Sequence, residues 1–315
     1  MRMRAASIAN PLSGNYRSKV RDAVGAAVHL SGAGRAFEIA ARPGGAVILM
    51  YHSVAPEDAA PYIEPANRID PRMFERQMAF LAAERRVVAL SELVNGKSLP
   101  ARAVCITFDD GYRDNLTVAA PILEKYRLPA TLFLATGYVE RAENQWSDTL
   151  HAAADRSLHA RLLEASHAER MRVLDQFPAA EKAPRLTLDW DEVRRLVRRY
   201  PRFEIGGHTR DHVDLTRHPG EARAQIEGCL ADLRRELGIE PRHFSYPYGR
   251  SCAETRQAVV RAGWRSAVVT DGAPRIGPAT DRYAMPRVEA PRSMTQLAFK
   301  TSGAFPGIFS MLGMA

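Results

Sequence analysis

The chain is poor in cysteine and lacks a long hydrophobic run. Only three of its 315 residues are cysteines, and Cys105, Cys229 and Cys252 show no paired spacing. This argues against a disulfide framework or a thiolate metal site, and it favours a reducing compartment. No stretch approaches the ~18 apolar residues of a membrane span. The basic start MRMRAASIANPLSGNYRSKVRDAVG has no apolar core of signal-peptide length. We therefore expect a cytoplasmic protein.

Lysine is also scarce, although the chain is basic. Five of the 44 basic residues are Lys and the others are Arg, and with 36 acidic residues the net charge is +8. Such a balance can indicate nucleic acid, an anionic membrane or an acidic substrate as partner. The Arg residues are mixed with Glu and Asp in stretches such as RRELGIE and DEVRRLVRRY, which is typical of solvated helix faces. No nucleic-acid-binding module accompanies them, so we rank nucleic-acid binding last among the functions considered.

What is present is an alternation of strands and helices. Apolar runs predict strands at 46–52, 87–90, 103–108, 130–136, 203–207, 243–246, 266–270 and 282–286. Helical patterns lie between them at 71–85, 115–126, 221–237 and 253–262. This alternation indicates an α/β fold of parallel βαβ units, and seven or eight such strands suggest a barrel.

The flanking regions differ from this pattern. We divide the chain into an N-terminal accessory arm (1–44), a catalytic domain (45–300) with a largely helical insertion at about 141–200, and a tail (301–315). Apolar residues recur at helical spacing in the arm, at Val20, Val24 and Val28. The helix that they predict either docks on the domain or touches a membrane surface. The apolar tail AFPGIFSMLGMA leaves the same two alternatives.

Several predicted strands are followed by groups that can do chemistry. Taken alone, the Asp-Asp-Gly that ends the strand at 103–108 is good turn chemistry. In a parallel barrel, however, the carboxyl ends of all strands meet at one rim. That rim would receive groups from four separate strands, which a turn alone does not explain. These groups are His52, Asp109, Asp110, His208, His212, Pro247 and Tyr248.

The stretch GGHTRDH supplies two imidazoles, His208 and His212, at a spacing of four. The pair alone is a weak signal, because a surface histidine pair is common. With one acid from another strand it becomes a two-His, one-carboxylate set, which leaves coordination positions open for water and substrate. The second acid would then be free to act as a base, and the nearby cation would keep it ionised.

TFDDG, followed by HTRDH and YPYG, resembles the polysaccharide deacetylase family (NodB homology, carbohydrate esterase family 4) over about residues 45–290. The resemblance implies a distorted (β/α)7-type barrel that removes an N-acetyl group from an amino sugar with one divalent metal ion. Zinc is the ion we expect, with cobalt, nickel or manganese as alternatives. It also implies roles for individual residues: Asp109 as catalytic base, Asp110, His208 and His212 as metal ligands, the Tyr248 N–H as oxyanion donor, and Tyr246 and Pro247 as substrate-binding residues.

Two positions depart from the family pattern. The family carries an Arg before the Pro-Tyr of its third motif, where this chain has Ser245. Arg287, in the strand-end sequence MPR, is our candidate for a substitute, and a solvated or structural Arg is the alternative. The family's late histidine is also missing, since no His follows His243. ILMYHSV resembles the circularly permuted branch of the family, which implies that His52 is the general acid; a structural His is the alternative.

The insertion contributes a further pair of candidates. Trp146 and Asp148, in QWSD, are expected to line the sugar groove, because an aromatic face suits a pyranose; core packing is the alternative. The expected substrate is an N-acetylated glycan, for example a lipid-linked or nucleotide-linked intermediate. Two other functions stay open: hydrolysis of another amide, such as a formyl or cyclic ureide group, and non-catalytic glycan binding.

Overall fold

The computed structural model describes residues 45–96, 102–152, 156–176, 184–271 and 275–302. The predicted arm at 1–44 and residues 303–315 of the predicted tail lie outside these ranges. Within them, no helix combines the length and the apolar character that crossing a membrane requires.

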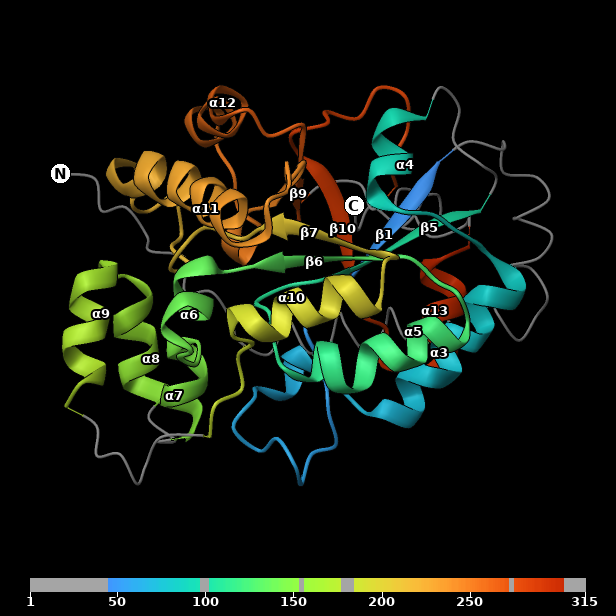
Figure 1. The fold of residues 1–315 in the computed structure, drawn as a ribbon, viewed down its shortest axis with the longest axis horizontal. Helices are drawn as coiled ribbons and strands as arrows, with labels where there is room; N and C mark the ends of the chain where they lie inside the picture. The colour runs from blue at the N-terminus through green and yellow to red at the C-terminus, as the bar shows by residue number, and fades with distance from the viewer. Residues whose placement is uncertain (1–44, 97–101, 153–155, 177–183, 272–274, 303–315) are drawn as a thin grey trace, which may run out of the picture.

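A parallel sheet closes into a barrel because its first strand pairs on both sides (Figure 1). Seven strands form the ring in this order: β1 (Ala46–Tyr51), β10 (Met285–Glu289), β9 (Ser266–Val269), β8 (His243–Ser245), β7 (Phe203–Gly207), β6 (Ala130–Leu134) and β5 (Ala103–Phe108), which pairs again with β1. The short strand β4 (Arg86–Val87) pairs with the start of β5. The predicted (β/α)7-type barrel is confirmed.

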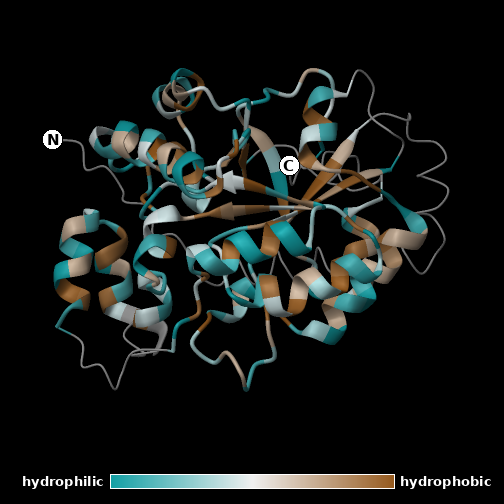
Figure 2. Cartoon of the chain, in the orientation of Figure 1, coloured by the Kyte–Doolittle hydropathy of each residue, from teal (hydrophilic) through white to brown (hydrophobic). Residues whose placement is uncertain are grey.

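The strand sequences explain why the sheet is parallel and enclosed. Every residue of β1 and of β5 is buried. Strands covered on both faces have continuous apolar sequences rather than alternating ones, and AVILMY and AVCITF have this character. Figure 2 shows hydrophobic strands inside a layer of helices whose outward surfaces are hydrophilic.

Helices cover the outside of the barrel: α3 (Pro71–Glu84), α4 (Leu90–Asn95), α5 (Ala120–Lys125), α10 (Trp190–Arg199), α11 (Ala222–Leu237), α12 (Ala253–Ala262) and α13 (Met294–Lys300). Helix α3 illustrates how the sequence determines them. The Asp70 carboxylate caps its first turn by accepting from the backbone N–H groups of Arg72 and Met73. Its apolar stripe, which includes Phe74 and Met78, is buried in the core.

The predicted insertion is smaller than expected. After α6 (Thr136–Arg141), three short helices pack together at one side of the barrel: α7 (Trp146–Ala152), α8 (Arg156–Leu163) and α9 (His167–Leu174). They share an apolar cluster of their own. Helix α10 was assigned to the insertion, but Val193 and Leu196 pack into the core of the barrel. Its many arginines had hidden this apolar stripe.

Two predicted strands are displaced. The strand expected at 282–286 is β10, which begins at Met285 because Asp281 holds the preceding residues in a turn. Its carboxylate accepts from the Tyr283 N–H (2.9 Å) and its carbonyl accepts from the Ala284 N–H (3.0 Å). Arg287 therefore lies within the strand rather than at its end. The strand expected at 87–90 ends at Val87, and Leu90 begins α4.

Candidate active site

Three side chains at the barrel rim form a possible metal centre. Asp110 follows β5, and His208 and His212 follow β7. The Nε2 atoms of His208 and His212 lie 3.5 and 3.4 Å from Oδ1 of Asp110. Ligands about 2.1 Å from a tetrahedral zinc ion are separated by about 3.4 Å, so this spacing fits a divalent cation. Oδ1 of Asp110 is buried and has no hydrogen-bond partner, as expected for an atom that binds an ion.

The orientation of His208 supports the same interpretation. Its Nδ1 lies 2.8 Å from the carbonyl oxygen of Ser245. A carbonyl can only accept, so Nδ1 carries the proton and the lone pair of Nε2 faces the site. Burial lowers the pKa of His208, and burial together with the nearby charge of Arg170 lowers the pKa of His212 well below its usual range. Both rings are therefore neutral, which is the form that binds metals.

The pKa of Asp110 is shifted in the direction that disfavours metal binding. Burial, followed by the negative charges of Asp109 and Asp148, raises its pKa well above the usual range. A cation between the carboxylate and the two imidazoles would reverse this effect.

Asp109 is held by an arginine from the far end of the chain. Arg287, on β10, donates from Nη1 to Oδ1 (2.7 Å) and from Nη2 to Oδ2 (2.6 Å) of Asp109. Arg287 Nη2 also donates to the Ser245 hydroxyl (2.9 Å), which lies 3.4 Å from Oδ2 of Asp109. Burial alone would raise the pKa of Asp109. The charge of Arg287 and its hydrogen bonds outweigh burial, so the pKa of Asp109 stays below its usual range.

This contact shows which residue pairs with Asp109 although the third motif has Ser245 where the family has an arginine. The guanidinium comes from β10, and the serine that stands in the third motif bridges it to the carboxylate. The structure thus brings Arg287 to the predicted base; its catalytic role stays a prediction.

His52 follows β1 and borders the same rim. Its electrostatic neighbours include Asp109, Arg287 and His208, and burial is the main cause that lowers its pKa to about 4. The neutral ring therefore dominates at neutral pH. If His52 protonates a leaving group, the proton must reach it during the reaction. The assignment as general acid, and with it the permuted branch, stays a prediction.

Two polar residues missed in the sequence fix the His52 loop. Asn115 donates from Nδ2 to the carbonyl of His52 (2.8 Å). Asp114 accepts from the Ser53 hydroxyl (2.6 Å) and the Val54 N–H (2.9 Å). Asn115 begins a π-helical turn, η2 (Asn115–Ala119), in place of the regular helix expected at 115–126. The sequence signal for these two residues was the polar pair Asp-Asn at the end of TFDDGYRDN, because it lies at the start of a helix that faces the core.

Left-handed backbone recurs at the site. Asp110 (φ 73°), Thr209 (φ 63°), His212 (φ 49°) and Tyr248 (φ 58°) all have positive φ, which costs non-glycine residues free energy and concentrates at functional sites. The Tyr248 ring packs against His212, with ring centroids 4.8 Å apart. This conformation places Tyr248 beside the metal ligands; its N–H as oxyanion donor stays a prediction.

The predicted substrate-binding residues are all buried. Tyr246 packs on Phe244 and donates its hydroxyl to the Tyr283 carbonyl (3.2 Å), so its side chain lies in the core. Its contact with substrate stays a prediction. Pro247 is buried at the start of the turn that presents Tyr248.

The two insertion residues are packed against their neighbours. Trp146 lies in the cluster shared by α7, α8 and α9, where the Arg170 guanidinium stacks on its ring, which is the core packing named as the alternative. The sugar contact of this pair stays a prediction. Asp148 accepts from the Tyr112 hydroxyl (2.9 Å). Burial raises the pKa of Asp148 to about 7, and its charge acts on Asp110. Both residues support the site from behind.

A parallel barrel with a two-His, one-carboxylate set and a separate, arginine-held carboxylate at its rim is the arrangement of a hydrolase. The family model described as polysaccharide deacetylase matches residues 96–267. The chain belongs to the polysaccharide deacetylase family, and the resemblance seen in its motifs is confirmed. Membership indicates an enzyme that acts on acetylated sugars.

Known proteins agree with this assignment. YxkH of Bacillus subtilis (strain 168), a relative assigned to the polysaccharide deacetylases, is 24% identical over 270 residues, which span 82% of this chain and 76% of YxkH. The deacetylase PplD of Streptococcus pyogenes has a TM-score of 0.60 at 20% identity and is covered to 98%; IcaB from Ammonifex degensii has 0.58 at 22% and is covered to 97%. Each matches 82% of this chain. At these identities the structures show the shared fold.

Proposed function

We propose that the protein is a metal-dependent hydrolase that removes an N-acetyl group from an amino sugar in a polysaccharide or glycan intermediate. The observation that carries this proposal is the pair Asp109 and Asp110. One carboxylate is held ionised by Arg287, and the other faces two neutral imidazoles with an unpartnered oxygen. Two adjacent residues thus have different roles, Asp109 as general base and Asp110 as metal ligand.

The residues of the chain divide the work. Asp110, His208 and His212 would hold the divalent ion, which supplies a Lewis acid for the acetyl carbonyl and lowers the pKa of water. Asp109 accepts the proton of the attacking water, because its ionised form is stabilised by Arg287. The Tyr248 N–H donates to the oxygen that becomes negatively charged. His52, after taking up a proton, delivers it to the departing nitrogen, and Asp109 releases the proton of water to solvent; acetate and a free amine result.

The test is acetate release by the purified protein. It is incubated with zinc or cobalt against a panel of N-acetylated sugars, N-formylated sugars and cyclic ureides, and again after chelation. We expect acetate from at least one amino sugar, loss of activity with chelator, and recovery on adding metal. Turnover of ring amides alone would make the protein a different amidohydrolase, and no turnover with any metal would favour a glycan-binding role.

We also propose a reducing, cytoplasmic location. All three cysteines are free, and Cys105 and Cys229 are buried. Fractionation of cells that express the full chain would test this.

A further inference from the structure

A cavity borders His52 on the side away from the metal ligands. It has a volume of about 100 Å³ and lies at the carboxyl ends of β1 and β10. His52 and Ser53 line one side, Glu289 and Arg292 line another, and Arg68 of β3 (Arg68–Ile69) closes it. The cavity is thus adjacent to the residue that we propose protonates the leaving nitrogen.

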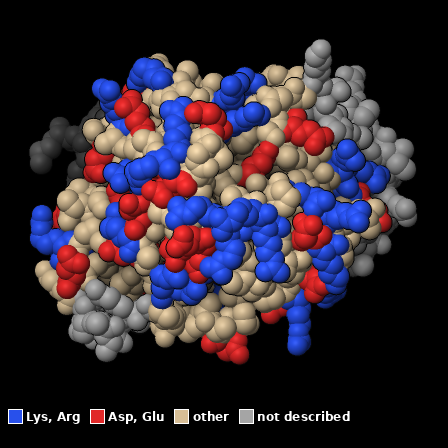
Figure 3. All heavy atoms as spheres, viewed as in Figure 1, with Lys and Arg blue, Asp and Glu red and all other residues tan. Residues whose placement is uncertain are grey.

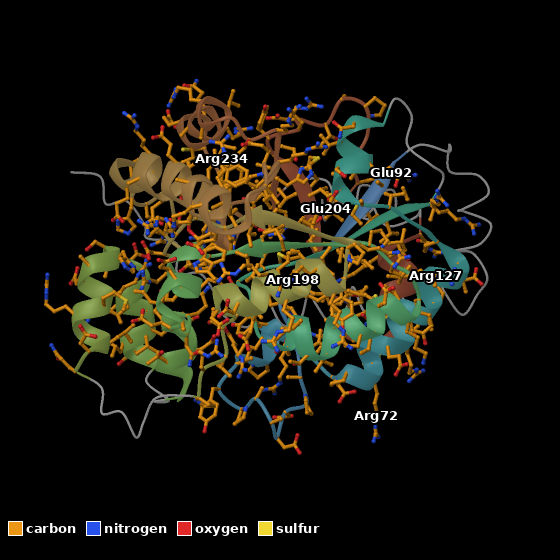
Figure 4. All side chains as sticks on the ribbon, in the orientation of Figure 1. Arg72, Glu92, Arg127, Arg198, Glu204 and Arg234 are labelled. Atoms are coloured by element: carbon orange, nitrogen blue, oxygen red, sulfur yellow. The ribbon has the colours of Figure 1, made fainter. Side chains whose placement is uncertain are left out.

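A second hollow of about 310 Å³ continues outward from this cavity. The two share Arg68, Ile69 and Arg292 as walls. The outer wall is the first part of α3, which contributes Arg72 and Arg76. Arg72 and Arg76 are both exposed, and Figure 4 shows Arg72 extended away from α3. We call the joined hollows the arginine groove, defined by Arg68, Arg72, Arg76 and Arg292.

The charges of this groove are poorly compensated. Arg72 and Arg76 form no side-chain hydrogen bond or ion pair with any residue that the structure describes. The Asp70 carboxylate is already occupied as the cap of α3. Glu289 is the one acid lining the inner cavity. By contrast, the α11 arginines Arg223, Arg234 and Arg235 all pair with acids.

The inner arginines are oriented by the backbone. Arg292 donates from Nη1 to the carbonyl of Arg68 (2.8 Å) and from Nη2 to the carbonyl of Ala66 (2.6 Å). Arg68 in turn donates to the carbonyls of Ala60 and Ile63. These bonds fix the position of both guanidinium groups. The exposed Glu57 lies 3.7 Å from Nη2 of Arg68 and offsets part of its charge. Arg292 forms no ion pair with any acid that the structure describes.

We propose that the arginine groove binds a phosphoryl group, so that the substrate is an N-acetylated amino sugar that carries phosphate. Two arginines at the inner cavity and two more in the adjoining outer hollow suit a multiply charged tetrahedral anion, to which arginine donates in bidentate pairs. A sugar whose acetamido nitrogen lies at His52 would place a neighbouring phosphoryl group in this cavity. This inference rests on the proposed function, and it names the substrate class that the same site accepts.

The test measures binding to the full chain, with and without chelator, by calorimetry at low salt. The probe is glucose 1-phosphate, which has no acetyl group and cannot be turned over. We expect binding by the unmodified protein in both conditions. The double variant Arg72→Gln, Arg76→Gln changes only exposed, unpartnered side chains and should weaken binding about fivefold. Arg292→Gln should weaken it more, with folding checked by thermal unfolding.

The matched control is the double variant Arg195→Gln, Arg198→Gln, which removes the same two positive charges. Both are exposed arginines of α10 outside the groove, and their replacement should leave the affinity unchanged (Figure 4 labels Arg198). Equal weakening by this control would reduce the effect to net charge and overturn the proposal. Absence of binding by the unmodified protein would also overturn it, as would tighter binding of glucuronic acid, which would assign the groove to a carboxylate. Since the assay needs no turnover, it can fail while deacetylation stands, and the reverse.

Two further arms identify the source of the phosphoryl group. Uridine diphosphate tests a nucleotide-linked sugar. Phosphatidylcholine vesicles with and without polyprenyl phosphate test a lipid-linked one. Weaker binding of either probe by the double variant Arg72→Gln, Arg76→Gln supports the groove, and the probe that is affected names the source. If this variant and Arg292→Gln both bind the two probes as tightly as the unmodified protein, the proposal is contradicted.

Discussion

Asp109 and Asp110 are neighbours in the chain, yet they lie in opposite electrostatic surroundings. Asp109 accepts two hydrogen bonds from a buried guanidinium, and its pKa is held below the usual range. Asp110 has a buried oxygen without a partner, and its pKa is raised. The left-handed backbone at Asp110 reverses the chain and allows consecutive carboxylates to face different partners.

The difference shows how a buried site can contain two adjacent acids. Two carboxyl groups on adjacent buried residues cannot both ionise unless the negative charge of each is compensated. Arg287 compensates Asp109 within the protein. Asp110 has no such partner within the described residues. Under the proposed function, the metal ion supplies its compensation, so the Asp109 side is complete in the folded chain and the Asp110 side is completed by the ion.

The largest effect is expected on the Asp110 side. The double variant His208→Ala, His212→Ala removes two ligands, so metal content and activity should fall together. The rate should drop at least about 10³-fold, because a Lewis acid is worth several kcal/mol of barrier. Elemental analysis and acetate release measure the two quantities. Full metal occupancy in this variant would show that the ion is held elsewhere.

Asp109→Asn should distinguish the roles of the two carboxylates. Asn has nearly the same shape but cannot accept a proton, so turnover should fall toward the upper end of about 10²–10⁴-fold while the metal stays bound. Asp110→Asn is the matched control and should lose the metal. If Asp109→Asn loses the metal to the same extent, the roles of the two residues are reversed.

His52→Ala tests the general acid. Its loss should lie in the range of about 10²–10⁴-fold, or 2.7–5.5 kcal/mol, with unchanged metal content. We expect the lower end, because burial lowers the pKa of His52 to about 4 and few molecules carry the proton at neutral pH. An activated aryl ester needs no proton on its leaving group and should be affected less. Equal losses on ester and amide would assign His52 a structural role.

Arg287→Lys should have the smallest effect at neutral pH, less than about tenfold, because lysine keeps the charge but loses the two-point contact. Asp109 is active when deprotonated, and Arg287 lowers its pKa. A weaker contact raises that pKa, so activity should be lost at higher pH on the acid side. The pH profile of kcat/KM measures this shift. An acid limb that does not move would mean that Arg287 does not control Asp109.

The barrel, and the meeting of Asp110, His208 and His212 at its rim, could be predicted from the sequence because both follow from local sequence patterns. TFDDG and HTRDH follow apolar strands directly, and parallel strands bring such positions to one rim. Arg287 could only be offered as a candidate. Whether it reaches Asp109 depends on the register of β10, which a turn at Asp281 moves toward the C-terminus.

Burial was harder to predict than position. Trp146 and Tyr246 lie near the site in the sequence motifs, but their rings belong to packed clusters. Aromatic residues serve sugar binding and core packing equally well, and only the tertiary structure distinguishes them. The arginine groove was also hidden. Arg68, Arg72 and Arg76 are close in the chain, but Arg292 comes from the loop after β10, and only the folded barrel brings it to them.

The barrel closes where its first strand meets its last, and this has a consequence for synthesis. β1 pairs with β10, and these two strands provide His52 and Arg287. At about 5–20 residues per second, β1 leaves the ribosome on the order of ten seconds or more before β10. During that time its apolar edge stays unpaired on one side, which exposes the nascent chain to aggregation and to chaperones. Chemistry then begins only in the finished molecule, because no shorter intermediate contains both residues.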